Sequence, residues 1–243
     1  WVNATVEKAK GTLEIDANAI TMRDVSFTHG TGAGTGSGAR RFGAGGQPDT
    51  IEATFQLREV NADLIEGLFM GDTRDLDGLF DATGSLAFPM PAGDTPVRNG
   101  MNGTIRFQAV NGTLGKAGLI SKLLTALRTT DILRLRIPQL RDRGLTFNTL
   151  SGSIAMENGV FHLAPYTMAD STYVLEADAL LDYPRDIASG TIEIQVLEGV
   201  TGVTRRIPFL GEAAGMVSKV FSVPIRISGA ASDPAFRPGI SGP

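Results

Sequence analysis

The sequence contains no cysteine and only two histidines, His29 and His162, among 243 residues. Without thiols the chain has no disulfide framework, thiolate zinc site, iron–sulfur cluster or thiol nucleophile. A basic excess is also missing, since 22 Lys and Arg against 26 Asp and Glu give a net charge of −4. This balance argues against a general nucleic-acid binder, and we expect no nucleic-acid partner.

Long uninterrupted apolar runs are absent as well. The longest helix-like apolar segments, near 117–128 and 206–221, are interrupted by polar or charged residues. They fall short of the roughly 20 residues that a membrane span needs. We therefore expect this stretch of chain not to cross a membrane. Because it begins with Trp1 in place of Met, we expect a mature or excised piece.

Short segments in which apolar and polar residues alternate recur along the whole chain. In 50–57, for example, Ile51, Ala53, Phe55 and Leu57 fall on one side of a strand and polar residues on the other. Strands with one apolar face are typical of antiparallel sheets, so the sequence predicts a mainly β protein. The same alternation is found in 13–17, 105–109, 154–156, 175–181, 192–196 and 225–227.

Glycine is abundant, at 30 residues, which favours a chain with many turns. Asn111-Gly112 and Asn158-Gly159 are the pairs preferred in two-residue type I′ hairpins. The glycine-rich segment 30–46 is predicted to be a mobile surface loop, whose deletion would leave thermal stability nearly unchanged. It lacks the Gly-Lys-Ser/Thr ending of a phosphate-binding loop.

Three segments have helical instead of strand periodicity: 61–70, 117–128 and 206–221. Each carries a narrow apolar stripe and is predicted to form a short amphipathic helix. The stripes fit two roles, which are capping an open end of the sheet core and contacting lipid or a partner helix.

No arrangement of residues points to catalysis. His162 alternates with apolar neighbours on a predicted strand and is expected to face outward or to be satisfied, and His29 is expected to be solvated. The acidic run 72–77 lacks the Gly and Glu of an EF-hand loop and contains Arg74, so a solvated turn is expected. We expect no enzyme, no cofactor and no metal site.

The second half of the chain carries motifs of a known family. A Phe-spacer-Leu-x-Gly segment around Phe147 precedes an alternating strand and Asn158-Gly159-Val160, and the chain closes on Ile227-Ser228-Gly229 followed by Asp233-Pro234. Over about residues 100–238 this pattern resembles the C-terminal region of the AsmA-like proteins, which are related to the TamB-like proteins. We accordingly divide the chain into an N-terminal β-rich segment with a glycine-rich loop, 1–99, and an AsmA-like region, 100–243, and we expect the two to share one continuous sheet.

The resemblance implies a curved, groove-like, taco-shaped antiparallel sheet with a few short helices. It implies the periplasmic part of an inner-membrane-anchored protein of a Gram-negative envelope, with phospholipid as its partner and lipid transport between the two membranes as its function. The alternative is a structural or outer-membrane assembly module that acts on envelope proteins by strand addition. An envelope hydrolase is the weakest reading, because no acid/base pair is visible.

The apolar face of the predicted strands supplies the candidate lining of a lipid groove. The same side chains would equally serve to pack against the predicted helices, and composition does not separate these outcomes. The candidate lining residues are Ile51, Phe55, Ile105, Phe107, Ile154, Leu175, Ile192, Ile194, Ile225 and Ile227.

Overall fold

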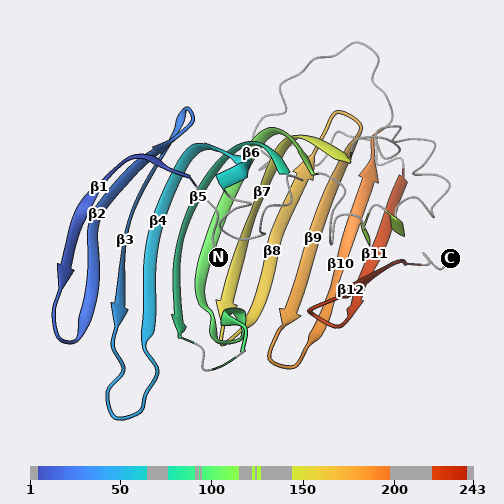
Figure 1. Cartoon of the computed structure of the whole chain (residues 1–243). Coiled ribbons are helices and arrows are strands. Elements are labelled where there is room, and N and C mark those ends of the chain that lie inside the picture. Colours follow the sequence, from blue (N-terminus) through green and yellow to red (C-terminus); the bar gives the residue numbers. More distant parts are fainter. Residues whose placement is uncertain are drawn as a thin grey trace.

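The computed structural model describes residues 5–64, 76–90, 93, 95–114, 122–123, 125–126, 144–197 and 221–239. These residues form one 12-stranded sheet in which the strands follow each other in chain order and every neighbouring pair is antiparallel. Figure 1 shows a curved sheet with β1 (blue) at one edge and β12 (red) at the other. The mainly β, curved antiparallel fold predicted from the sequence is confirmed.

The strands are long, and the alternating segments of the sequence lie within them, except that 13–17 extends two residues beyond the end of the first strand. The described residues contain a single 3₁₀ turn, η1 (Val97–Gly100), which lies between β5 and β6. These two strands pair with each other, so the sheet continues across residue 100, where the sequence analysis divides the chain. The strands are β1 (Glu7–Ile15), β2 (Ala19–His29), β3 (Gly32–Arg41), β4 (Thr50–Asn61), β5 (Leu76–Pro89), β6 (Asn102–Leu114), β7 (Leu145–Glu157), β8 (Val160–Ala169), β9 (Tyr173–Asp182), β10 (Ile187–Val196), β11 (Phe221–Gly229) and β12 (Pro234–Pro238).

The two predicted Asn-Gly hairpins have different outcomes. Asn158 and Gly159 connect β7 to β8 with φ of 48° and 79°, the positive values that a type I′ turn requires. Asn111-Gly112 is not a turn, and that prediction is wrong. Between Leu79 and Asp77 of β5 these two residues oppose Gly78 alone, so they form a bulge inside β6, where the positive φ of Asn111 is again needed.

The prediction of a glycine-rich loop at 30–46 is also wrong for most of that segment. Gly32–Arg41 is strand β3, which pairs with β2 on one side and β4 on the other. The glycines recur at every second position and share one face. A Cβ on Gly34 would lie 2.2 Å from the Cζ atom of Phe27, and one on Gly36 would lie 2.4 Å from the Thr54 carbonyl oxygen. Glycine is required because neighbouring side chains and backbone already fill that face. Removing this strand would break the sheet, so the expectation of a harmless deletion is withdrawn.

Only parts of the predicted helices fall within the described residues. Asn61 is the last residue of β4, and 62–64 are helical, as are 122–123 and 125–126. In 206–221 only Phe221 is described, and it begins β11. Over the described part of the chain, no helix is long and apolar enough to cross a membrane.

The buried core extends from β4 to β11 on one side of the sheet. It includes fully buried side chains such as Phe147, Met168 and Tyr173, together with Leu64 from the helical turn after β4 and Leu123. Burial of these side chains supplies the main favourable free energy of folding. The buried Tyr173 hydroxyl donates to the Thr146 carbonyl oxygen, so its polar group is satisfied.

We predict that Gly34→Val destabilises the protein by about 1–3 kcal/mol, because the new side chain would overlap the Phe27 ring. Ala33→Val is the matched control on the same strand. Ala33 is exposed on the opposite face, and the free energy of unfolding should change by less than about 0.5 kcal/mol. Urea denaturation measures both variants, and equal effects would contradict the packing of β3.

Candidate functional site

All ten candidate lining residues lie on one face of the sheet. Residues directly opposite each other in neighbouring strands point to the same side. Phe55 on β4 is opposite Gly84 on β5, which is opposite Ile105 on β6, and Ile105 is opposite Ile154 on β7. The register of the remaining strands brings the other candidates to this side as well.

Two rows of paired residues follow the sheet across its strands. Both consist of apolar residues and glycine, apart from the hydroxyl of Tyr166. We call the first row the Phe55 row and the second the Phe107 row. The Phe55 row is Val25, Gly36, Phe55, Gly84, Ile105, Ile154, Leu163, Ala179, Gly190, Ile227 and Phe236; the Phe107 row is Phe27, Gly34, Leu57, Ala82, Phe107, Gly152, Tyr166, Ala177, Ile192 and Ile225.

Large and small residues alternate along parts of these rows. Gly152 lies between Phe107 on β6 and Tyr166 on β8, and the two ring centroids are 6.2 Å apart across it. A Cβ on Gly152 would meet the Phe107 ring at 2.7 Å, and a Cβ on Gly84 would meet the Phe55 ring at 2.8 Å. The aromatic rings therefore lie over glycines of adjacent strands, which keeps the apolar surface continuous.

Burial divides the ten candidates into two sets. Leu175, Ile192, Ile194, Ile225 and Ile227 on β9–β11 are buried, and Ile194 is only 1% exposed. The other five, on β4, β6 and β7, are half-buried: Ile51, Phe55, Ile105, Phe107 and Ile154. The apolar face is thus closed at its C-terminal end and partly accessible between β4 and β7.

The candidate lining omits several members of this face. The alternation of 50–57 places Leu57 on the same side as Phe55, and the structure confirms it there at 3% exposure, but the candidate lining does not include it. Phe27 and Tyr166 are separated from the nearest alternating runs by register shifts in β2 and β8, which break the period of two. Their place on this face follows only from the strand pairing.

The opposite face of β4–β8 is polar and holds a hollow of about 850 Å³. Its lining includes the exposed Arg58 and Arg106, while Asp81 accepts hydrogen bonds from the Glu59 backbone N–H at 2.7 Å and from Gln108 Nε2 at 2.9 Å. The Asp81 carboxylate therefore accepts the backbone N–H that the bulge in β4 leaves without a ladder partner. The sheet has one apolar and one polar face.

The two histidines lie far apart in the sheet. His162 is outward-facing as predicted, with Nε2 3.1 Å from Asp178 Oδ1 and half of its side chain exposed. His29 is not simply solvated, since its side chain is 13% exposed and both ring nitrogens have partners, so that expectation is wrong. Over the residues that the structure describes, no group of three or more His, Cys, Asp or Glu side chains could hold a metal ion.

No family model, no curated protein and no solved structure matches this chain. The resemblance to the AsmA-like family therefore rests on the sequence motifs, and what it implies is taken up below as a proposal.

We predict that a carboxylate has different effects in the two parts of the apolar face. Ile194→Asp should lower the free energy of unfolding by about 3 kcal/mol or more, because the charge would be buried without a partner. Ile51→Asp should cost only about 1 kcal/mol, since a half-buried position on β4 lets the carboxylate reach water. Denaturant titration compares the two, and equally large losses would show that the face is closed throughout.

Proposed function

We propose that this chain is a segment of an envelope-spanning protein that carries phospholipid between the inner and outer membranes along the apolar face of its sheet. The chain would form part of the periplasmic region of an inner-membrane-anchored protein in a Gram-negative envelope. The AsmA-like motifs of residues 100–238 and the architecture of the sheet support this proposal together.

The observation that carries the proposal is the continuity of the Phe55 row. It crosses the sheet from β2 to β12 and contains no polar or charged side chain. Neighbouring strands are about 4.8 Å apart, so the row is about 50 Å long. An acyl chain on the partly accessible part of this row, on β4–β7, would meet no unfavourable contact with a charged group.

The partly accessible section on β4–β7 is where acyl chains would lie. A closed core would bury Phe55, Ile105 and Ile154 fully, yet all three are half-buried. Exposed apolar area of this kind is unfavourable in water and is favourable when lipid covers it. The buried section on β9–β11 would stabilise the fold and hold the rows in register.

The alternative, an assembly module that acts by strand addition, has less support from the edges of the sheet. β12 is five residues long and has proline at both ends, Pro234 and Pro238, which cannot donate to a new strand. The first half of β1 carries Lys8 and Lys10 and a bulge with Lys8 at φ 51°. Lysines and bulges at an edge are devices that oppose strand addition.

Lipid binding is tested with matched substitutions on the two faces of the same strands. Ile105→Asp and Ile154→Asp place a charge on the apolar face, whereas Thr104→Asp and Ala155→Asp place it on the exposed opposite face one residue away. We predict that phospholipid co-purifies near stoichiometrically with the unaltered protein and with both controls. The two apolar-face variants should be folded but lose most of it.

Native mass spectrometry of protein extracted from cells measures the bound phospholipid, and circular dichroism checks the fold. Absence of phospholipid from the unaltered protein, or equal retention by all four variants, would contradict the proposal. A protein partner recovered without lipid would favour the assembly function instead.

A further inference from the structure

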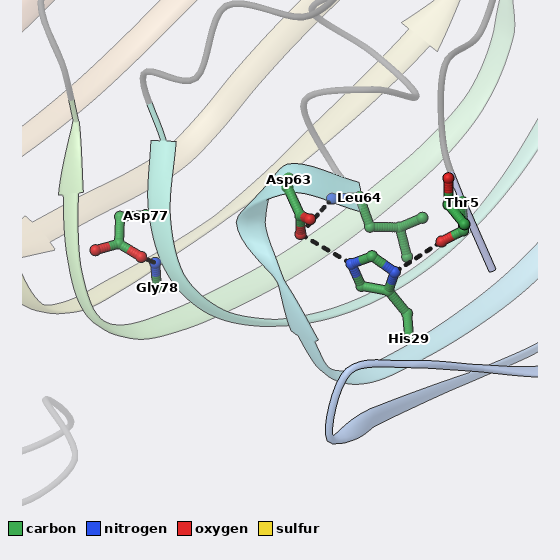
Figure 2. Close-up of polar contacts among 6 residues, drawn as sticks. All are labelled: Thr5, His29, Asp63, Leu64, Asp77 and Gly78. Atoms are coloured by element: carbon green, nitrogen blue, oxygen red, sulfur yellow. Dashed lines mark hydrogen bonds and ion pairs between the residues drawn. The ribbon is translucent and has the colours of Figure 1, made fainter. Parts of the chain in front are cut away.

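One side chain connects three separate parts of the chain at the N-terminal end of the sheet. His29 is the last residue of β2, and its Nδ1 is 2.9 Å from the carbonyl oxygen of Thr5, which lies just before β1. Its Nε2 is 2.8 Å from Asp63 Oδ1, in the helical turn after β4. Figure 2 shows the imidazole ring between these two oxygen atoms.

Both partners of the ring are hydrogen-bond acceptors. A backbone carbonyl has no hydrogen to donate, and an ionised carboxylate has none either. Both nitrogens must therefore donate, and only the doubly protonated imidazolium carries a hydrogen on each. The geometry consequently requires a positively charged His29 for both contacts to be made.

The electrostatic surroundings favour that charged form. Burial acts to lower the pKa of His29, but the hydrogen bonds to Asp63 and Thr5 and the negative charges of Asp63 and Glu7 raise it above the ordinary value of 6.5. The hydrogen bond from His29 in turn lowers the pKa of Asp63 below 3.8, against a smaller opposing effect of burial. Asp63 and Glu7, the charged groups that act on the ring, are both acidic.

The part of β1 next to this contact is weakly held by the sheet. The β1–β2 ladder has register shifts between Glu7 and Lys10 and again between Lys10 and Thr12, whereas Thr12–Ile15 is regularly paired. Every residue of β1 is exposed, so no burial compensates for the interrupted ladder. The contact from His29 to Thr5 secures the beginning of the strand.

We propose that His29 is a pH-sensitive clasp that holds the start of edge strand β1 against the end of β4. The clasp does not depend on the proposed lipid transport. When the ring loses a proton, the remaining N–H stays with the Asp63 carboxylate, because a hydrogen bond to a charged acceptor is the stronger one. The Thr5 contact is then lost, and residues 5–10 detach while 12–15 stay paired.

The direction of the pH dependence follows from the two shifts. Because the pKa of His29 is raised in the folded protein, its contribution to stability is complete below about pH 6.5, the pKa of the unfolded state. This contribution is lost as pH rises through the pKa of the folded state. Because the pKa of Asp63 is lowered, its contribution is present above about 3.8 and is lost as pH falls through its folded value. The clasp is therefore closed in mildly acidic solution and opens as pH rises through the folded-state pKa of His29, which lies above 6.5.

Amide hydrogen exchange of the whole chain tests the clasp between pH 5.5 and 8.5, after correction for the intrinsic rates. We expect protection of residues 6–10 to fall at least several-fold as pH rises, while that of residues 12–15 stays constant. Asp63→Asn removes the charge that holds the proton on His29, so its transition should shift to lower pH. Asp178→Asn, which removes the partner of the exposed His162, is the matched control and should behave as the unaltered protein.

A nuclear magnetic resonance titration of the two imidazole rings provides the second measurement. The pKa of His29 should lie above 6.5 and fall in the Asp63→Asn protein. Protection of residues 6–10 that does not change with pH, or a transition that Asp63→Asn leaves in place, would overturn the proposal. Either result would show that the contact is structural and carries no switch.

Discussion

The rest of this structure depends on the strand register that brings the apolar side chains of the core to one face of the sheet. A shift of one residue in any strand pair would move all its apolar side chains to the polar side. Phe55, Ile105 and Ile154 meet only because β4 to β7 are paired as they are. Because the strands lie in the sheet in chain order, each strand pairs with the strand that precedes it in the sequence.

Bulges allow the strands to bend while the pairing on either side of each bulge keeps the apolar side chains on the same face. In the bulges of β4 and β6 two residues oppose one, and a residue with positive φ, Glu59 in β4 and Asn111 in β6, takes up the difference. Bulges increase the local twist of a strand, which suits a curved sheet. The freed Glu59 N–H donates to Asp81 from the next strand, so the bend leaves that polar group satisfied.

Contacts between aromatic rings and glycines connect the packing to the shape of the apolar face. Phe27 covers Gly34, Phe55 covers Gly84, and Phe107 shares the space over Gly152 with Tyr166. A larger residue at these glycines would lift the rings and interrupt the row that the proposed lipid would follow. The pH-sensitive contact of His29 lies apart from this packing, at the edge where the ladder is least regular. Transport and clasp would accordingly use different physical interactions.

The sequence by itself determined the faces of the strands whose alternation is regular, β4, β6, β7, β9, β10 and β11, because side-chain direction in a strand has a period of two and needs no knowledge of neighbours. It also determined the Asn158-Gly159 turn, whose backbone conformation is a local preference. Only the tertiary structure decided that 32–41 is a strand. Its glycines are required because the Phe27 ring and the Thr54 backbone occupy the space that side chains would fill. It alone decided which candidates are buried or half-buried, and it brought Thr5, His29 and Asp63 together. These features depend on contacts between residues distant in sequence, which local patterns do not encode.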